Sequence, residues 1–394
     1  MGIRNIVGQA VRKEDYFHRP IEEKKLRNAI SSGSHVLISA PRRVGKTSLM
    51  FYLMDNPCKG CIYLYLITQS IHDAPSFYKK LHTALLDSEN ADKAIKINTK
   101  AKKLFSSIID RFKKVSVTGI GEVEMKEDKE LDYPELCWQI LETLDLKGSK
   151  LVIMIDEFPQ TVENIREQSE AEAIKFLQQF QELTKSPNLA GKVQFVLTGS
   201  IGLENVVSRM SASKYISDFN SHSVSPLSEK EARSFIAELA EGMEFSMTEE
   251  GILELLKLIR WHIPFFIQLL INELENLHIE EPFELVDKDR CKKAFENAIR
   301  RRHYFDHWGK RLKKSFKTQG YKLAVDILNK IANNDFYSSN EIHDLAVKHE
   351  LEEDYKEVVH TLAYDGYINN DDDNAVYRFN SPLLQAWWRK HVTN

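Results

Sequence analysis

The sequence contains few cysteines and no long hydrophobic run, and these absences exclude several classes of protein. Its 394 residues include four cysteines, which are too few for a disulfide framework. The longest apolar run without a charged residue, Trp261–Asn272, has twelve residues, whereas a membrane-spanning helix needs about 20. The N-terminal stretch also lacks the apolar segment of a secretory signal. We therefore expect a cytoplasmic protein that does not enter a membrane.

Glycine and proline are also scarce, at 16 and 11 residues, which excludes collagen-like and low-complexity structures. Hydrophobic residues make up 42% of the chain and charged residues 28%, as is typical of a globular protein. Cys58 and Cys61 have the spacing of half a zinc site, but a structural zinc ion needs a second pair of ligands. Cys137 and Cys291 are isolated in the sequence. We therefore favour a tight turn before an apolar strand at Cys58 and Cys61.

Short apolar segments recur in the first half of the chain in the pattern of a parallel sheet. At about 100–200 residues per domain, the length allows two or three domains. Helical stretches such as 171–183 separate the apolar segments, which is typical of an α/β domain with helices on both faces of the sheet. The expected strands are 34–39, 62–67, 151–155 and 193–197, with a weaker fifth at 221–227.

A phosphate-binding loop follows the first of these strands. The sequence Ala40-x-x-x-x-Gly45-Lys46-Thr47 lies between a strand and a helical segment. In such loops the backbone N–H groups surround the phosphates, the helix presents its N-terminus, and the lysine adds a positive charge. Gly45 stands where the backbone must approach the phosphates most closely, and Thr47 is expected to bind Mg²⁺. The residues expected to bind ATP here are Ala40, Pro41, Arg42, Arg43, Val44, Gly45, Lys46, Thr47 and Ser48.

Polar residues also follow the third and fourth strands. Asp156 and Glu157 stand at the carboxyl end of a buried strand, where ligands bind in open α/β sheets. We expect Asp156 to hold Mg²⁺ and Glu157 to polarise the attacking water as a general base. Thr198 and Ser200 are expected to sense the γ-phosphate, with Thr198 preferred. Lys46, Glu157, Asp156 and Thr198 form the expected catalytic set.

Three arginines near these motifs have open roles. Arg42 and Arg43 lie inside the loop, where they would steer nucleotide or meet a partner subunit. Arg209 follows the sensor segment and is a candidate arginine finger supplied to a neighbouring molecule. An ordinary exposed arginine is the simpler interpretation of Arg209.

The remaining sequence indicates further parts beyond the sheet. Residues 228–299 have apolar spacing of helical type, and the last part ends in two short strands around an Asn/Asp tip. The predicted organisation is a P-loop ATPase domain over 1–227 with a hairpin insertion near 113–125, a helical lid over 228–299, a basic connector over 300–322 and a winged-helix domain over 323–394.

Charge is distributed unevenly over the last two parts. The net charge is −4, but the connector carries nine Lys or Arg against one Asp, whereas 323–394 carries six against thirteen Asp or Glu. Opposite charges allow the two parts to attract each other. The connector is also the one plausible nucleic-acid surface, through Arg300, Arg301 and Arg302. Because residues 351–362 of the winged helix are acidic and repel phosphates, we favour a connector helix that packs its aromatics and docks the acidic part.

Several segments together resemble the archaeal-type ATPases of the STAND and AAA+ group. They cover nearly the whole chain: Tyr16-Phe-His-Arg19, the loop APRRVGKTSLM, Ile153–Phe158, Phe195–Ser200, Ser225–Ser228, Trp261–Gln268 and Tyr377–Trp388. The resemblance implies a sheet of strand order 5-1-4-3-2, a helical lid and a C-terminal winged helix. It further implies that Phe17 and Arg19 lie near the adenine and that the lid closes near Pro264. The sequence departs from the family at Ala40 and in the Trp-His-Ile-Pro of the lid.

These observations favour an ATP-driven switch. In this hypothesis ATP and Mg²⁺ are the cofactors, hydrolysis moves the lid and winged helix, and a protein partner or a second copy of the chain reads the change. The alternative is a DNA-binding ATPase of the origin-recognition or loader type, acting through the basic connector. A nucleotide-binding scaffold without turnover is a third, weaker possibility.

Overall fold

The computed structural model describes residues 2–87, 132–144, 146, 148–371 and 373–393. Contacts divide the chain into two compact units. The sheet unit comprises Arg19–Ser39 and Leu53–Ser223, and the loop–lid unit comprises Met1–His18, Ala40–Tyr52 and Val224–Asn394. The hairpin expected near 113–125 lies outside the described residues. The domain limits expected from the sequence stay a prediction.

Five parallel strands form the sheet, in the order β2-β3-β4-β1-β5. This is the order that the resemblance implied, read from the other edge. The strands at its centre are buried along their length because helices cover both faces, which explains their continuous apolar sequences. Their bounds are β1 (His35–Ser39), β2 (Cys61–Ile67), β3 (Lys150–Asp156), β4 (Val193–Thr198) and β5 (Phe219–Ser223).

The expected fifth strand at 221–227 is wrong in position. β5 begins at Phe219, whose ring packs into the core, and it ends at Ser223. The sequence that follows includes Pro226, which has no backbone N–H to donate to a neighbouring strand. The pairing of β5 with β1 therefore starts two residues earlier than expected, with His35 opposite Phe219.

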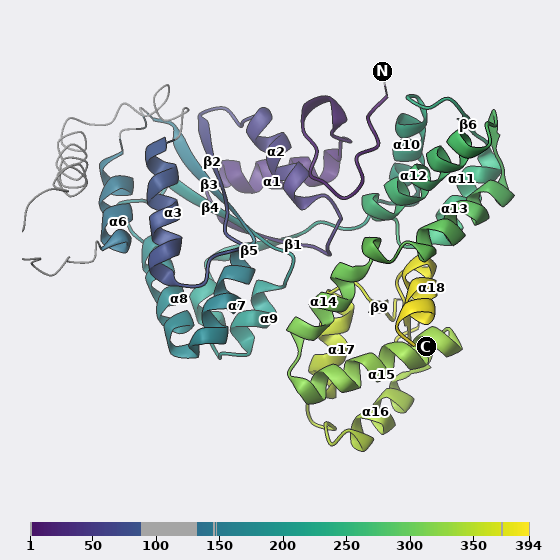
Figure 1. The fold of residues 1–394 in the computed structure, drawn as a ribbon. Coiled ribbons are helices and arrows are strands. Elements are labelled where there is room, and N and C mark those ends of the chain that lie inside the picture. The colour runs from purple at the N-terminus through teal and green to yellow at the C-terminus, as the bar shows by residue number, and fades with distance from the viewer. Residues whose placement is uncertain (1, 88–131, 145, 147, 372, 394) are drawn as a thin grey trace, which may run out of the picture. The chain divides into compact units, whose positions relative to one another are not determined.

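Aromatic residues dominate the core between the sheet and the helices on one of its faces. Phe77, Phe158 and Phe180 pack together, with ring centroids 5.8 Å apart for Phe77 and Phe158 and 4.7 Å for Phe158 and Phe180. Figure 1 shows α1 on the opposite side of the sheet from α7 and α8. The helices of this unit are α1 (Pro20–Ser32), α3 (Ala74–Asp87), α6 (Tyr133–Thr143), α7 (Phe158–Gln168), α8 (Glu170–Thr184) and α9 (Leu203–Ser208), with a 3-10 turn η2 (Ser213–Ile216).

The loop–lid unit begins with a 3-10 turn η1 (Lys13–Asp15) and includes most of α2 (Lys46–Asp55). Four longer helices follow: α10 (Glu229–Ala240), α11 (Glu249–Ile259), α12 (Pro264–Glu280) and α13 (Lys288–Arg300). The twelve-residue apolar run falls in and just before α12, which starts on Pro264 and buries both Phe265 and Phe266. Two short strands not expected from the sequence, β6 (Ser246–Met247) and β7 (Leu285–Val286), pair in parallel between these helices.

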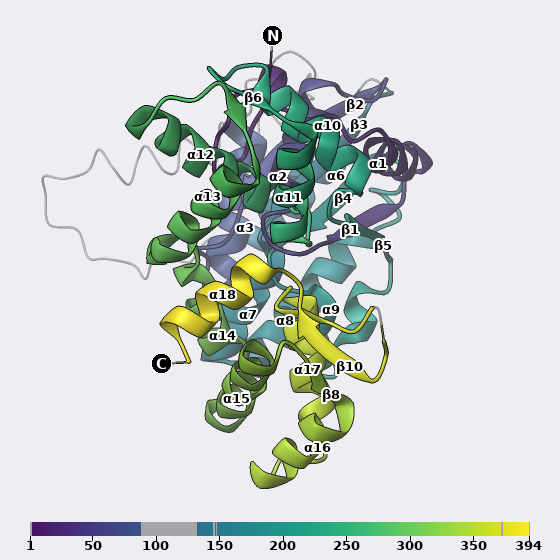
Figure 2. The ribbon, with the colours of Figure 1, turned by 90° about the vertical axis from the view of Figure 1, so that its right-hand side faces the viewer.

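The C-terminal part of this unit combines helices with a small antiparallel sheet. These are the elements expected of a winged helix, and that assignment stays a prediction. Figure 2 shows the sheet strands beside α17. The elements are η3 (Arg302–Tyr304), α14 (Asp306–Ser315), α15 (Thr318–Asn334), α16 (Ser339–Lys348), α17 (Tyr355–Tyr364) and α18 (Pro382–His391), with strands β8 (Tyr337–Ser338), β9 (Ile368–Asn369) and β10 (Val376–Phe379) in the order β8-β10-β9.

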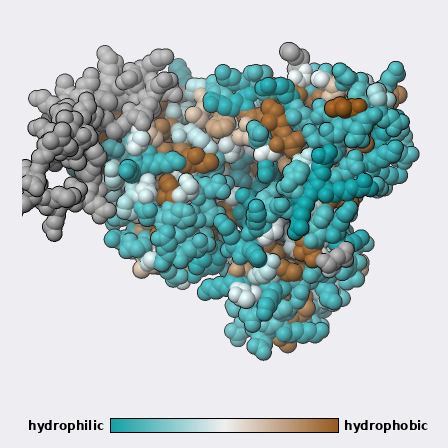
Figure 3. Space-filling model, viewed as in Figure 1, coloured by the Kyte–Doolittle hydropathy of each residue, from teal (hydrophilic) through white to brown (hydrophobic). Residues whose placement is uncertain are grey.

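The surface is mostly hydrophilic on the face drawn in Figure 3. Large exposed apolar side chains come from separate elements rather than from one, for example Ile21 in α1, Ile279 in α12 and Phe336 before β8. Within the described part of the chain, no helix combines the length and apolar character that crossing a membrane requires.

Candidate functional site

The phosphate loop is the first part of the candidate site, and it lies in the loop–lid unit. It follows Ser39, the last residue of β1, and ends where α2 begins at Lys46. Gly45 has φ +98°, a conformation that side-chain-bearing residues rarely adopt. No atom lies within 4 Å of where its Cβ would stand. The backbone conformation, rather than crowding, therefore requires glycine at this position.

Lys46 folds back over the start of the loop. Its Nζ donates hydrogen bonds to the carbonyl oxygens of Ala40, at 2.9 Å, and Pro41, at 2.8 Å. The residue is 8% exposed. The two acceptors in these bonds are neutral carbonyls, and an ammonium binds the charged oxygen atoms of a phosphate more strongly than a neutral acceptor. The loop is thus arranged to accept an anion.

Arg43 connects the loop to other parts of the same unit. It has φ +66°, and its Nη1 donates to the carbonyl oxygen of Gly8. Its guanidinium lies 4.8 Å from the ring centroid of Phe265, in α12, as in a cation–π contact. Burial lowers the pKa of Arg43, although an arginine stays charged in proteins. One side chain of the phosphate loop therefore contacts both the N-terminal segment and the expected lid.

His307 in α14 lies near the same arginines. Its burial, and then the positive charges of Arg43, Arg42 and Arg311, lower its pKa to about 2, so the imidazole is neutral at physiological pH. The ring is 4.0 Å from that of Trp308 and 6.0 Å from that of Phe265. Its Nε2 is buried without a hydrogen-bond partner. The connector thus places an uncharged imidazole near the cationic loop.

The N-terminal segment also packs against the loop helix. The hydroxyl oxygen of Ser48 accepts a hydrogen bond from the backbone N–H of Val11, at 3.0 Å. Tyr16 stacks on Tyr52 of α2 with centroids 4.7 Å apart. Phe17, expected near the adenine, has its ring 5.0 Å from that of Phe235 in α10. The segment therefore joins α2 to the expected lid.

Arg19, also expected near the adenine, and Pro264, where the lid is expected to close, belong to different units. Pro264 is the first residue of α12, in the loop–lid unit. Arg19 belongs to the sheet unit, where its backbone N–H donates to Glu23 Oε1 at 2.8 Å and its guanidinium pairs with Glu22 at 3.3 Å. The places of Arg19 near an adenine and of Pro264 in the closing lid stay predictions.

The second part of the candidate site is the carboxyl end of β3, in the sheet unit. Asp156 is the last residue of β3 and is 3% exposed. Its Oδ1 accepts the backbone N–H of Glu157 at 3.0 Å, and its Oδ2 accepts the hydroxyl of Tyr65 at 3.0 Å. Burial and the negative charge of Asp156 raise the pKa of Tyr65, so the phenol keeps its proton and donates. The carboxylate is thereby fixed in orientation.

Glu157 adopts a left-handed backbone conformation, with φ +62°, at the start of α7. Its Oε2 accepts two hydrogen bonds from Ser200, from the backbone N–H at 3.0 Å and from the hydroxyl at 2.9 Å. A left-handed conformation at a residue other than glycine is strained, and such residues cluster at functional sites. Ser200, expected as a second sensor, therefore acts here on the position of the expected base.

Thr198 is the last residue of β4 and lies opposite Asp156 in the sheet register. It is fully buried, and its Oγ1 has no hydrogen-bond partner. Gly199 follows it, where a Cβ would stand only 2.6 Å from Cδ of Pro159. The structure thus brings Asp156, Glu157, Thr198 and Ser200 together at the carboxyl ends of β3 and β4.

Both parts fit the cofactors expected from the sequence. Mg²⁺ prefers oxygen ligands and is commonly bound through one or two carboxylates plus phosphate oxygens, and Asp156 offers an oriented carboxylate. Phosphate suits a glycine-containing loop at a helix N-terminus with a buried ammonium. The described residues contain no cluster of three or more His, Cys, Asp or Glu that would hold a metal by protein ligands alone.

Sequence reasoning missed two residues that the structure places at these parts. Tyr65, which holds Asp156, lies two residues before the end of β2, and Ile67 is opposite Asp156 in the register. A pairing of β2 with β3 together with the two-residue period of a strand would have indicated it. His307 gave no such signal, because its neighbours are distant in the sequence.

The basic connector packs as a helix on the acidic C-terminal part. The Arg311 guanidinium and the Asp365 carboxylate form an ion pair at 2.5 Å, with side chains 6% and 3% exposed. Ser315 Oγ also donates to Asp365, at 3.0 Å, and the hydroxyl of Tyr367 donates to the carbonyl oxygen of Trp308, at 2.6 Å. Phe305 and Trp308 of the connector are core residues, whereas Tyr304 and Phe316 are half-buried.

Comparisons with known proteins address the fold. No protein-family model and no curated protein matches the chain. The Walker-type ATPase PABY2304 of Pyrococcus abyssi superposes with a TM-score of 0.67 at 18% identity, over 98% of this chain and 99% of that one. The ORC2 protein of Aeropyrum pernix, in its ADPNP–ADP complexes, superposes with a TM-score of 0.57 at 12% identity, over 95% of each chain. At such identities the likeness shows the fold alone: a five-stranded parallel α/β sheet with further helical parts, as in these two structures.

Proposed function

We propose that this protein binds and hydrolyses Mg-ATP and acts as a switch whose nucleotide state is passed to its lid and C-terminal part. The observation that carries the proposal is the position of Arg43. It is a phosphate-loop residue, yet its guanidinium contacts Phe265 of α12 and the N-terminal Gly8. A phosphate near the loop would compete for this guanidinium, because a charged partner is preferred to a neutral carbonyl.

The connector provides the next step of the proposed coupling. Arg43 lies near His307, which stands one residue before Trp308, and Trp308 accepts the hydroxyl of Tyr367 through its carbonyl oxygen. A movement of the loop arginines would change the electrostatic surroundings of His307 directly. α14 is tied to the last part of the chain by the buried pair of Arg311 and Asp365. The coupling therefore needs no residue outside the loop–lid unit.

The chemistry of hydrolysis is assigned to the residues expected from the sequence. Lys46 binds the β- and γ-phosphates, Thr47 and Asp156 hold Mg²⁺, and Glu157 receives the proton of the attacking water. When bound, Mg²⁺ neutralises developing charge on the phosphates. Thr198 donates its unpartnered hydroxyl to the γ-phosphate. The two structures matched above, a Walker-type ATPase and an ORC2 protein in ADPNP–ADP complexes, support ATP as the nucleotide.

A protein partner or a second copy of the chain is proposed as the reader of the switch, in preference to DNA. The arginines considered for nucleic acid each have an acidic partner in the chain: Arg300 with Glu296, Arg301 with Glu273 and Arg302 with Asp306, at 3.9, 2.9 and 3.6 Å. The pairs of Arg300 and Arg302 are exposed and therefore weak, so they reduce affinity for phosphates without abolishing it. The partner of Arg301, Glu273, is fully buried, which makes Arg301 the least available of the three to a phosphate.

Two measurements test the proposal. Equilibrium titration with a fluorescent ATP analogue should give saturable Mg-dependent binding that Lys46→Ala abolishes and that Glu170→Gln, an exposed control in α8, leaves unchanged. Normal affinity in Lys46→Ala would refute the loop assignment. Hydrogen exchange should then differ between the ATP and ADP states over α12 and α14 in the wild type. Arg43→Ala should weaken binding less than Lys46→Ala does, and at saturating nucleotide it should lose that difference. If Arg43→Ala keeps the full difference, the coupling does not pass through this residue.

A further inference from the structure

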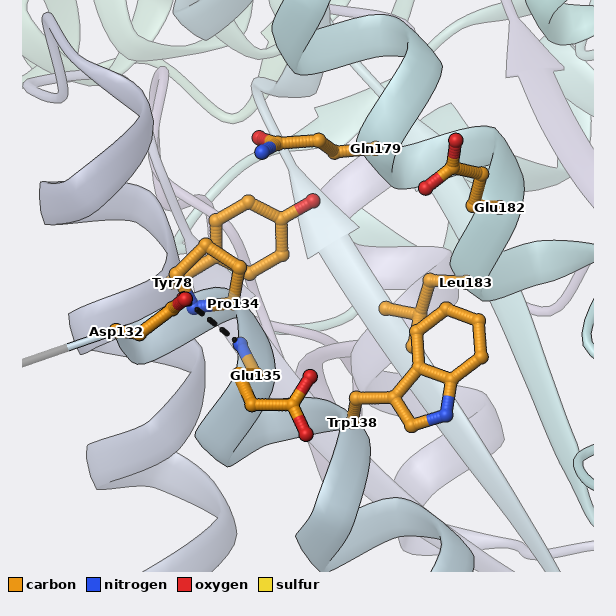
Figure 4. A pocket seen from close by; sticks show the side chains of 8 residues that line it. All are labelled: Tyr78, Asp132, Pro134, Glu135, Trp138, Gln179, Glu182 and Leu183. Atoms are coloured by element: carbon orange, nitrogen blue, oxygen red, sulfur yellow. Dashed lines mark hydrogen bonds between the residues drawn. The ribbon is translucent and has the colours of Figure 1, made fainter.

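A pocket in the sheet unit belongs to neither part of the candidate site. It lies among α3, α6 and α8 and has a volume of about 210 Å³. A single water needs only about 10–15 Å³ of such space, so the pocket has room for a group of several atoms. Figure 4 shows the residues that line it: Tyr78, Asp132, Pro134, Glu135, Trp138, Gln179, Glu182 and Leu183.

The charge of the pocket is entirely negative. Asp132, Glu135 and Glu182 contribute three carboxylates, and neither lysine nor arginine is among the lining residues. Asp132 Oδ1 accepts the backbone N–H of Glu135 at 3.1 Å, and Glu135 Oε1 accepts the amide of Gln139 at 2.7 Å. Each of these carboxylates therefore keeps a second oxygen. Within the described part of the chain, none of the three forms an ion pair.

A buried hydroxyl group is the second, independent indication that this pocket binds a ligand. Tyr78 is 2% exposed, and its hydroxyl has no hydrogen-bond partner. In Figure 4 this hydroxyl points into the space between Gln179 and Glu182. Leaving a buried hydroxyl unpaired costs free energy. Burial raises the pKa of Tyr78, so the group is a neutral phenol that both donates and accepts.

The walls of the pocket suit an alkyl chain. Pro134, Trp138 and Leu183 present apolar surface, and the aromatic ring of Trp138 attracts a cation that approaches its face. Trp138 is held in place because its Nε1–H donates to Glu142 Oε1 at 2.6 Å. Lys79 does not line the pocket. Its ammonium lies instead 6.0 Å from the ring centroid of Tyr133.

We propose that this pocket binds an organic ammonium group, namely the side chain of a lysine presented by a basic segment of a protein partner. The ammonium is placed between the Tyr78 oxygen, Gln179 and Glu182, and its alkyl stem lies along Pro134 and Trp138. A peptide source is favoured over a free amine because Asp132 and Glu135 are exposed at the rim, where they meet further basic residues of such a segment.

Fluorine NMR of the full chain carrying 5-fluorotryptophan tests the site, since the sequence has five tryptophans and Trp138→Phe identifies the signal of interest. The probe is N-acetyl-lysine-N′-methylamide, and its uncharged analogue, N-acetyl-norleucine-N′-methylamide, is the matched control. The Trp138 signal alone should shift, and saturably, with the lysine probe. An equal shift with the norleucine compound would overturn the proposal.

Variants separate the groups that bind the probe. Glu182→Gln should weaken binding at least tenfold, because it removes a charge-assisted hydrogen bond, and Tyr78→Phe should weaken it about fivefold. Glu170→Gln, also in α8 but outside the pocket, should bind as the wild type does. Unchanged affinity in both pocket variants, with the other four signals in place, would refute the site. If 1,5-diaminopentane binds more than tenfold tighter than the lysine probe, the assigned protein source is wrong.

Discussion

The ion pair of Arg311 with Asp365 gives the sharpest prediction for stability. The pair is at 2.5 Å with side chains only 6% and 3% exposed, so it is shielded from water. Asp365→Asn keeps the shape of the side chain but removes the carboxylate charge that pairs with the buried Arg311 guanidinium. Removing one partner of a buried pair costs about 3–5 kcal/mol. We therefore expect the loop–lid unit to lose unfolding free energy of this order.

Urea unfolding followed by tryptophan fluorescence measures this loss, because Trp308, Trp387 and Trp388 are buried in the same unit. Glu249→Gln is the matched control. It makes the same acid-to-amide change in an exposed pair, in which Arg233 and Glu249 lie 2.6 Å apart with side chains 30% and 70% exposed. Such a pair contributes less than about 1 kcal/mol. Equal losses in Asp365→Asn and Glu249→Gln would refute the reasoning.

Three further predictions concern the two parts of the site. Because the folded-state pKa of His307 is about 2, below its ordinary value, the unfolded chain binds one more proton as the pH falls below about 6.5. Unfolding free energy should thus fall by up to about 1.4 kcal/mol per pH unit between pH 6 and 5. In urea titrations at a series of pH values, His307→Phe should remove this contribution to the dependence of unfolding free energy on pH. Tyr65→Phe should raise the Mg²⁺ concentration for half-maximal hydrolysis about tenfold, with little change at saturation, because Asp156 loses its positioning hydrogen bond. Thr198→Val should slow phosphate release at least tenfold while leaving unfolding free energy equal or up to about 1 kcal/mol higher, since the lost hydroxyl is unpartnered in the fold.

The parts of the fold that depend on local sequence were predictable. β1, the phosphate loop and β3 are marked by apolar runs that end at Ala40 and Asp156, and the structure has strands there. The strand order was implied by the resemblance to known ATPases, and it is confirmed. The displacement of β5 to Phe219 was not visible, because a half-exposed edge strand has a weak apolar pattern.

Contacts between distant segments were not predictable from one sequence. Arg43 was noticed inside the loop, but its contact with Phe265 depends on how α12 packs. Nothing in the sequence distinguishes His307 from the other histidines. Its burial beside arginines is visible only in the structure. Ser200 was identified as a polar residue after β4, whereas its two hydrogen bonds to Glu157 follow from the strained start of α7.

The measurement that tests the central claim most directly is phosphate release from Mg-ATP by the wild type and by Glu157→Gln, each alone and with duplex DNA at low salt. The account predicts slow hydrolysis by the wild type that DNA does not change, and ATP that stays bound but uncleaved in Glu157→Gln. Wild-type turnover by Glu157→Gln would contradict the assignment of the base. Strong stimulation of hydrolysis by DNA would contradict the proposal that a protein partner reads the switch, and would favour a DNA-coupled ATPase.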